Sequence, residues 1–345
     1  MLRRRFIQTA ALASAAKLFS APKPEKLALG QIGTTHAHAG DKYATVVGLN
    51  DLFEQAGVAE GDAVRREALT KSKAFAAARW RTEAELLGDP AIQGVVIETS
   101  LEAATPTALR ALQAGKHVHL DKPGGTDHGT FQKMRREAEK RGRTLQMGYM
   151  LRYNPGIILL QEAVRSGWLG EIRQVDATMN KFADPNLRRQ LLEIPGHGML
   201  ELGCHLVDTV VDLLGEPSKV EAQAVRTGTD ALPCRQTAWL SYAQTKATIT
   251  CDHNDPKARR FLRVEGSRGW MQVEPLEGRR VTYHFTDPPS DYQPGEQTRQ
   301  LASNGSRYAA ELQDFARQIR GGQTRWNAAH DICVHAVARL AAGLS

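Results

Sequence analysis

The chain has 345 residues, of which 41% are hydrophobic and 24% are charged, so its composition is that of a globular protein with room for a packed core. This length favours two domains. The formal net charge is +7, but the basic residues form only small clusters without interleaved aromatic residues, so we expect no nucleic-acid partner. The four cysteines form no C-x-x-C pair, which argues against a cysteine-based zinc site.

The amino terminus has the order of a signal peptide. Three arginines, Arg3 to Arg5, precede an alanine-rich, weakly apolar run and then small residues. Arg3-Arg4-x-Phe6-Ile7 resembles a twin-arginine export signal. We therefore expect residues 1–26 to be a signal and linker, and the protein to be periplasmic or otherwise exported, or cytoplasmic if the signal does not function. The apolar run is too short to span a bilayer, so we expect no stable membrane span.

Residues 27–149 alternate short apolar runs with helical segments. The predicted strands are 27–33, 57–59, 92–99, 117–120 and 144–149, and the predicted helices are 34–49, 62–79, 105–114 and 131–141. Each strand–helix unit takes about 25 to 30 residues, which is typical of β-α-β units. This half therefore predicts a parallel sheet with right-handed crossovers.

The pattern changes after residue 150. A helix at 155–166 precedes alternating runs with few helices between them, at 173–180, 219–226, 237–242, 245–251, 260–265 and 269–273. Such runs predict an antiparallel sheet. We also expect a helix at 199–214, a loop at 287–306 and two closing helices at 308–320 and 328–342.

The turn after the first strand reads Gly33-Thr34-Thr35-His36-Ala37-His38, where a dinucleotide fold has G-x-G-x-x-G. Only the first glycine is kept, and the two histidines either donate to a phosphate or lie in a polar turn. Glu60 ends the second strand, where a carboxylate accepts hydrogen bonds from ribose hydroxyls and repels a 2′-phosphate. Glu60 therefore favours NAD over NADP, with a solvated loop acid as the alternative.

Asp121-Lys122-Pro123 directly follows the strand at 117–120. The carboxyl ends of parallel strands face the ligand crevice. A sheltered lysine there loses pKa through desolvation and can act as an acid or a base. A surface turn is the alternative.

Glu201 and His205 are four residues apart and share one face of the predicted helix, which Asp208 continues. A histidine flanked by carboxylates is suited to remove a hydroxyl proton. Two alternatives stay open: a metal site of Glu201, His205 and His197, and a structural histidine. We predict no metal among the site residues.

Several motifs occur in the order typical of one family. They are Gly33, the acid after Gly57-Val58-Ala59, Ala114-Gly115-Lys116-His117-Val118 before Lys122-Pro123, Arg152-Tyr153-Asn154-Pro155, Ser166-Gly167-Trp168-Leu169-Gly170-Glu171-Ile172, the histidine helix ending Leu214-Gly215-Glu216-Pro217, and Val264-Glu265-Gly266-Ser267-Arg268-Gly269. From residue 27 onward, the chain resembles the glucose-fructose oxidoreductase, inositol dehydrogenase and MocA (Gfo/Idh/MocA) family.

This resemblance implies an α/β protein with an amino-terminal Rossmann domain at 27–149. The remaining 150–345 would form a carboxyl-terminal α/β domain whose large, mostly antiparallel open sheet makes a homo-oligomer. It also implies NAD(P) and a sugar-like substrate at the cleft between the domains. The implied cofactor-binding residues are Gly33, Thr34, Thr35, His36, Glu60, Thr99, Asp121, Lys122 and Pro123. The implied substrate-binding residues are Arg152, Tyr153, Asn154, His205 and Asp208.

Lys122 matches the lysine of the family's E-K-P motif, Glu201 its usual aspartate and His205 its active-site histidine. The resemblance implies that Lys122 touches the substrate hydroxyl and the nicotinamide ribose. His205 would take the hydroxyl proton as hydride leaves, while Glu201 holds His205 in position.

The chain departs from the family pattern in three places. Two motif glycines are lost, Asp121 and Glu201 replace the usual glutamate and aspartate, and residues 99–104 lack the histidine of T-P-x-x-x-H. We expect NAD(H)-dependent oxidation or reduction of a secondary alcohol on a sugar, polyol or glycoside. One alternative is redox-assisted glycoside hydrolysis or isomerisation without net cofactor turnover. The other is a non-catalytic carbohydrate-binding protein on a degenerate Rossmann fold.

Overall fold

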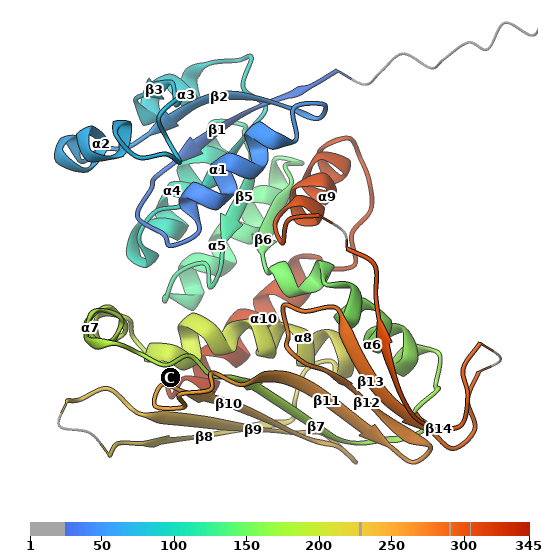
Figure 1. Cartoon of the computed structure of the whole chain (residues 1–345). Helices are drawn as coiled ribbons and strands as arrows, with labels where there is room; N and C mark the ends of the chain where they lie inside the picture. The colour runs from blue at the N-terminus through green and yellow to red at the C-terminus, as the bar shows by residue number, and fades with distance from the viewer. Residues whose placement is uncertain (1–24, 228–229, 290, 304) are drawn as a thin grey trace, which may run out of the picture.

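The computed structural model describes residues 25–345 except 228–229, 290 and 304. The predicted export signal therefore lies almost wholly outside the described residues. Two sheets with helices between them organise the molecule (Figure 1). None of the helices in the described part of the chain combines the length and hydropathy needed to cross a membrane.

The first sheet is fully parallel, with the strand order β3-β2-β1-β4-β5-β6. This is the doubly wound order of a dinucleotide-binding fold, as predicted. Its strands are β1 Leu27–Ile32, β2 Phe53–Ala59, β3 Trp80–Arg81, β4 Gly94–Ile97, β5 His117–Asp121 and β6 Leu145–Gly148. Its helices are α1 Ala39–Gly48, α2 Ala63–Thr70, α3 Glu83–Gly88, α4 Leu101–Gln113 and α5 His128–Lys140.

The single helix predicted at 62–79 is wrong, because α2 ends at Thr70. None of the α2 side chains is buried, so no core contact extends the helix. Phe75 follows in a turn and packs with Tyr43 and Trp80 in a small separate cluster.

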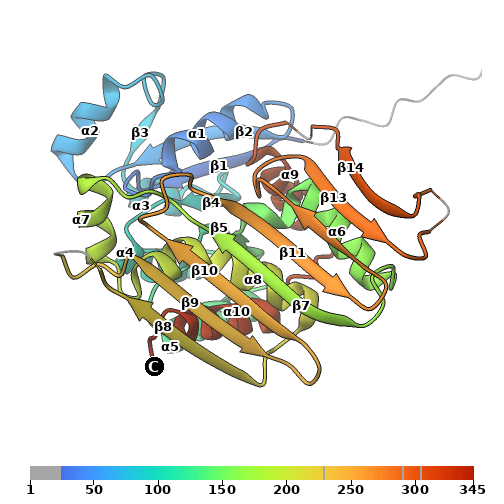
Figure 2. The same cartoon turned by 60° about the horizontal axis from the view of Figure 1, so that its bottom comes forward.

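The second sheet has eight strands in the order β14-β13-β12-β11-β7-β10-β9-β8, and only the β7–β10 pair is parallel. Its strands are β7 Ile172–Met179, β8 Lys219–Val225, β9 Arg235–Ser241, β10 Lys246–Asp252, β11 Arg260–Gly266, β12 Gly269–Val273, β13 Arg280–Phe285 and β14 Gly295–Gln300. Helices α6 Pro155–Arg165, α8 Cys204–Leu214 and α10 Ala328–Ala341 cover one face, and the other face is open (Figure 2). The large, mostly antiparallel sheet is confirmed.

The sequence did not predict strands β13 and β14, helix α7, Pro185–Glu193, or the 3₁₀ turn η1, Met150–Tyr153. The loop predicted at 287–306 contains β14. This edge strand is exposed along nearly its whole length, so no buried face imposes an apolar alternation on its sequence.

Helix α9, Ala309–Ile319, returns to the first sheet. Leu312 and Phe315 join a core cluster with Leu29, Val46 and Val96. Residues 150–345 therefore do not all pack with the second sheet, because α9 covers one face of the parallel sheet beside α1 (Figure 1).

Candidate active site

The turn after β1 depends on Gly33. Gly33 has φ +87°, in the left-handed region, and a Cβ there would lie 2.6 Å from Cγ2 of Thr99. The chain therefore passes against Thr99, two residues after β4, with no room for a side chain. Helix α1 begins only at Ala39, so residues 33–38 form a long turn at the carboxyl edge of the sheet.

Glu60, which directly follows β2, lies beside this turn. Its carboxylate accepts hydrogen bonds from Oγ1 of Thr34 and, at 3.0 Å, from the amide of Asp62. Arg65 donates to the Thr34 carbonyl at 2.5 Å, and its Nε lies 3.7 Å from the Glu60 carboxylate. Thr34 and Arg65 therefore hold Glu60 at the tip of β2.

A cleft of about 420 Å³ runs beside these residues. Gly33, Thr35, Glu60, Thr99 and Arg66 are among the residues that line it. Among the described residues, no acceptor pairs with the Thr35 amide, which leaves that donor available to an anion. The close turn at Gly33, the free amide and the carboxylate at the second strand tip together fit NAD(P).

His36 and His38 point toward the strand tips rather than into that cleft. Their Nδ1 atoms lie 3.4 and 3.0 Å from Oδ2 of Asp121. His36 also lies 3.2 Å from Glu98, a buried carboxyl that directly follows β4. Of the two roles considered for the histidines, the polar turn matches this geometry more closely than donation to a phosphate.

Lys122 and Glu201 form a buried ion pair. Nζ of Lys122 donates to Oε1 of Glu201 at 2.6 Å and to its main-chain carbonyl at 2.7 Å. Burial lowers the pKa of Lys122, but the negative charges of Glu201 and Asp121 outweigh burial and raise that pKa above its usual value. The expectation that desolvation lowers the lysine pKa is therefore wrong, and Lys122 stays protonated.

A π-helical turn, Met199–Gly203, explains why Glu201 turns to Lys122. Its wider hydrogen-bond spacing breaks the four-residue α-helical relation between Glu201 and His205 that the sequence suggested. A Cβ at Gly198 would lie 1.7 Å from Nε2 of His253, so the approach to this turn needs glycine. The structure pairs Glu201 with Lys122, and not with His205 as the resemblance implied.

His205 is buried on the first turn of α8, and within the described chain its Nδ1 has no hydrogen-bond partner. Burial, reinforced by the positive charge of Lys122, lowers its pKa well below 6.5. The ring packs edge-on to Tyr149, with ring centroids 5.8 Å apart. His205 is thus a neutral imidazole with a nitrogen available to accept a proton.

Four of the predicted substrate-binding residues take part in internal contacts. Arg152 donates to Asp208 and to Asp331, at 2.6 and 2.7 Å, and all three side chains are buried. Tyr153 donates to Asp314 at 2.8 Å, and Asn154 caps helix α6. Their contact with a substrate stays a prediction.

The structure does not support the alternative metal site of Glu201, His205 and His197. Nδ1 of His197 lies 3.0 Å from the carbonyl of Leu191, and Glu201 is paired with Lys122.

Three residues near the site were missed: Lys42, Glu98 and Lys181. Burial, together with the nearby charge of Arg260, lowers the pKa of Lys181, whose surroundings also include Glu201 and Lys122. Glu98 carried a signal, because it directly follows the apolar run of β4.

Two family models match the chain. The oxidoreductase family with an NAD-binding Rossmann fold matches residues 28–149, and the GFO/IDH/MocA C-terminal domain matches residues 157–272. Both domain types expected from the motifs are therefore present, in the expected order.

Individual proteins agree with this assignment. The uncharacterized oxidoreductase YdgJ of Escherichia coli (strain K12) is 30% identical over 193 residues, 53% of this chain and 54% of that protein. The scyllo-inositol 2-dehydrogenase (NADP(+)) IolW of Bacillus subtilis (strain 168) is 25% identical over 144 residues, 41% and 40% of the two chains. The chain thus spans about half the length, or less, of these curated relatives.

Solved structures resemble the whole fold. The UDP-N-acetylglucosamine 3-dehydrogenase GnnA of Acidithiobacillus ferrooxidans superposes with a TM-score of 0.76 at 22% identity, covering 92% of this chain and 97% of that one. This likeness concerns the fold, and the two domain matches show that the chain belongs to the Gfo/Idh/MocA family of oxidoreductases.

Proposed function

We propose that this protein transfers hydride between NAD(H) and a secondary alcohol of a sugar, polyol or glycoside. One observation carries the proposal: the buried Lys122–Glu201 ion pair lies at the carboxyl edge of a parallel sheet with a dinucleotide-type turn, and buried His205, whose Nδ1 has no partner in the described chain, is close enough for the Lys122 charge to lower its pKa. A base and a fixed positive charge are the two groups that oxidation of an alcohol needs.

In the oxidation direction, the free nitrogen of His205 accepts the hydroxyl proton. Lys122 stabilises the negative charge that develops on the alcohol oxygen, and Glu201 keeps Lys122 in place. A nicotinamide cofactor held in the cleft beside Gly33, Thr35 and Glu60 would supply the hydride acceptor. Burial of both residues excludes water from the proton transfer.

We assign NAD rather than NADP because of Glu60. Its carboxylate is held at the tip of β2 and would repel a 2′-phosphate. Arg66 lines the same cleft and would attract such a phosphate, so the two side chains oppose each other.

Cofactor binding and turnover test the proposal. The purified protein is titrated with NADH by fluorescence and then assayed with sugars, polyols and glycosides at the nicotinamide absorbance band. We expect micromolar binding and net reduction of NAD by at least one class. Binding without net reduction, but with substrate conversion, would favour the redox-assisted alternative. Sugar binding that His205→Ala and Lys122→Ala leave unchanged would favour the non-catalytic one.

We also propose export of the folded protein through the twin-arginine pattern at Arg3-Arg4. Fractionation of cells expressing the full chain should find it outside the cytoplasm. Replacing both arginines by lysine should retain it in the cytoplasm. Equal distribution of the two forms would contradict the proposal.

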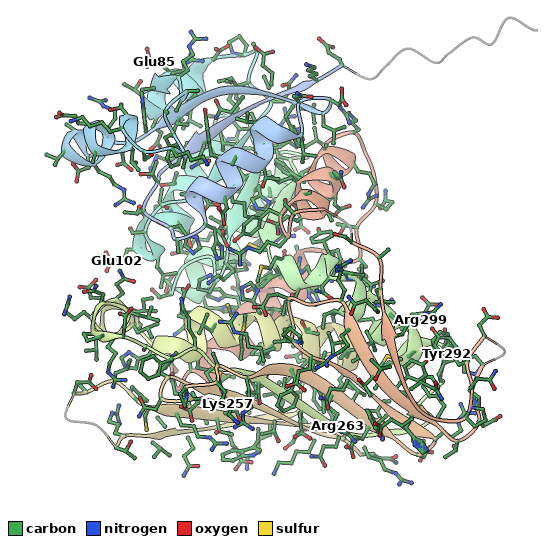
Figure 3. The ribbon with its side chains drawn as sticks, viewed as in Figure 1. Glu85, Glu102, Lys257, Arg263, Tyr292 and Arg299 are labelled. Atoms are coloured by element: carbon green, nitrogen blue, oxygen red, sulfur yellow. The ribbon has the colours of Figure 1, made fainter. Side chains whose placement is uncertain are left out.

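The open face of the second sheet is our proposed oligomer interface. Arg263 lies on this face, away from the helices, with its guanidinium 3.9 Å from the ring centroid of Trp270 (Figure 3). Arg263 lines a shallow hollow on this face together with Asp176, Thr248 and Gln272. Light scattering should show a multimer that Arg263→Glu dissociates, whereas a monomeric parent chain would rule this out.

A further inference from the structure

Four polar side chains meet at the carboxyl ends of three neighbouring parallel strands. His36 and His38 lie in the turn after β1, Glu98 directly follows β4, and Asp121 ends β5. One ligand atom each from His36, His38 and Asp121 lies within 4.8 Å of the others. Glu98 and Asp121 are almost fully buried, and the histidines are half-buried.

The spacing of the donor atoms is that of a small coordination shell. Nδ1 of His38 is 3.0 Å and Nδ1 of His36 is 3.4 Å from Oδ2 of Asp121, and Nδ1 of His36 is 3.2 Å from Oε2 of Glu98. Ligands held at 2.0–2.1 Å around a tetrahedral zinc ion lie about 3.3 Å apart. Three of the six donor–donor distances of a tetrahedral site are therefore already near this value, and the Glu98 carboxyl must turn to bring the others into range.

Hydrogen bonds alone leave this cluster unsatisfied. In the described chain, both carboxyl oxygens of Glu98 and Nε2 of His36 are buried without a hydrogen-bond partner. Nδ1 of His36 faces two carboxyl groups and carries at most one proton. Asp121 has the Lys122 amide and His38 as donors, so Glu98 is the carboxyl group left without a hydrogen-bond partner, which is costly at this depth.

The lysines near Glu98 and Asp121 also leave room for a bound cation. The nearest lysines are engaged elsewhere: Lys42 contacts Glu311 and lies 3.8 Å from Asp121, and Lys122 is paired with Glu201. Lys42 is therefore the nearest lysine to Asp121, and the ion pairs of the described residues give Glu98 no lysine or arginine partner. Buried charges are normally paired or bound to a metal.

We propose that His36, His38, Glu98 and Asp121 bind one divalent transition-metal ion, for which Zn²⁺ is the best fit. Two imidazoles and two carboxylates suit zinc and its first-row neighbours, whereas Mg²⁺ and Ca²⁺ prefer all-oxygen shells. With Glu98 turned inward as the fourth ligand, the shell has no open position, so the ion is structural. It fixes the 33–38 turn, where Thr35 and His38 stand in place of the last two motif glycines.

The test uses the full chain without a histidine tag and without added nicotinamide, so its result is independent of the proposed oxidoreductase activity. The protein is stripped with a chelator, dialysed against ZnCl₂ or CoCl₂, desalted and analysed for metal content. We expect about one ion per chain, visible absorption from bound Co²⁺, a higher Tm than the stripped protein, and no retention of Mg²⁺. Less than about 0.1 ion per chain would overturn the proposal.

Variants then locate the ion. His36→Ala/His38→Ala and Glu98→Gln/Asp121→Asn should each weaken Zn²⁺ binding at least tenfold, with circular dichroism reporting whether the chain is folded. His284→Ala, on β13 of the other sheet, is the matched histidine control and should bind as the parent chain does. Equal binding by parent and both cluster variants would place any bound ion elsewhere and overturn the assignment. If neither variant folds, the parent chain's ion count and Co²⁺ spectrum still decide.

Discussion

Nζ of Lys122 lies 2.6 Å from Oε1 of Glu201, and this bond joins the tip of β5 to the π turn before α8. One partner comes from the parallel sheet and the other from the half that carries the second sheet. The pair therefore sets how the two halves meet beside His205, and it fixes the protonation state of the lysine.

Glu201→Gln should move the alkaline limb of the pH–rate profile to lower pH. The Glu201 carboxylate raises the pKa of Lys122, so a neutral amide lets the lysine lose its proton earlier as pH rises. Turnover near neutral pH should fall roughly 10²- to 10³-fold if the lysine charge is lost or misplaced. Steady-state kinetics over the alkaline range measure both effects.

Lys71→Met, at an exposed helix end, serves as the control for loss of a lysine charge and should leave the profile unchanged. An unchanged alkaline limb in Glu201→Gln would mean that this limb does not report the protonation of Lys122.

His205→Asn should lower kcat/KM for alcohol oxidation about 10²- to 10⁴-fold, because it removes the proposed base. In the parent chain, the low pKa of His205 keeps the imidazole neutral. The acid limb of the pH–rate profile should therefore lie below pH 6.5. A limb at or above that pH would contradict a buried, neutral base.

The same shift has a sign for stability. A buried histidine with a lowered pKa contributes to stability when the pH is above 6.5, the pKa of histidine in the unfolded chain. This contribution is lost as the pH falls toward the lower pKa of the folded state. His119, whose pKa burial lowers to about 3, acts in the same direction.

The parallel half and its site were largely predictable from the sequence, because buried strands give apolar runs and the ligand crevice follows from topology. Contacts between distant segments were not. The Lys122–Glu201 bond depends on a π turn that the α-helical period hides, and the buried position of Glu98 depends on neighbouring strands. Helix α9 was predicted as a helix, but its own sequence did not indicate that it covers the first sheet.

Asp208→Ala should destabilise the fold by about 3–5 kcal/mol, because Arg152 loses a buried partner. Burial raises the pKa of Asp208, but Arg152 and His330 outweigh it and lower the pKa to about 2. The carboxylate thus stabilises the fold at neutral pH, and this contribution is lost as pH falls below about 4 toward 2. Urea unfolding at pH 7 measures the change.

The double variant Arg152→Met/Asp208→Leu distinguishes the stability that the ion pair contributes from the cost of leaving one buried charge unpaired. With both charges removed, part of the stability should return, since a buried pair replaced by apolar groups is often neutral. A variant that keeps its stability but shows a raised KM would instead favour the predicted substrate contact of these two residues.

Glu60→Ser should shift cofactor preference toward NADP by at least about tenfold, because it removes the carboxylate that would repel a 2′-phosphate. Arg66, which lines the same cleft, then attracts that phosphate without opposition from Glu60, and adding Arg66→Ala should reverse the gain. The ratio of the Kd values for NAD and NADP, measured by fluorescence titration of the three proteins, tests this. Tighter binding of NADP than of NAD by the parent chain would contradict the assignment of NAD. It would show that the attraction of Arg66 for the 2′-phosphate outweighs the repulsion by Glu60, since both side chains line the same cleft.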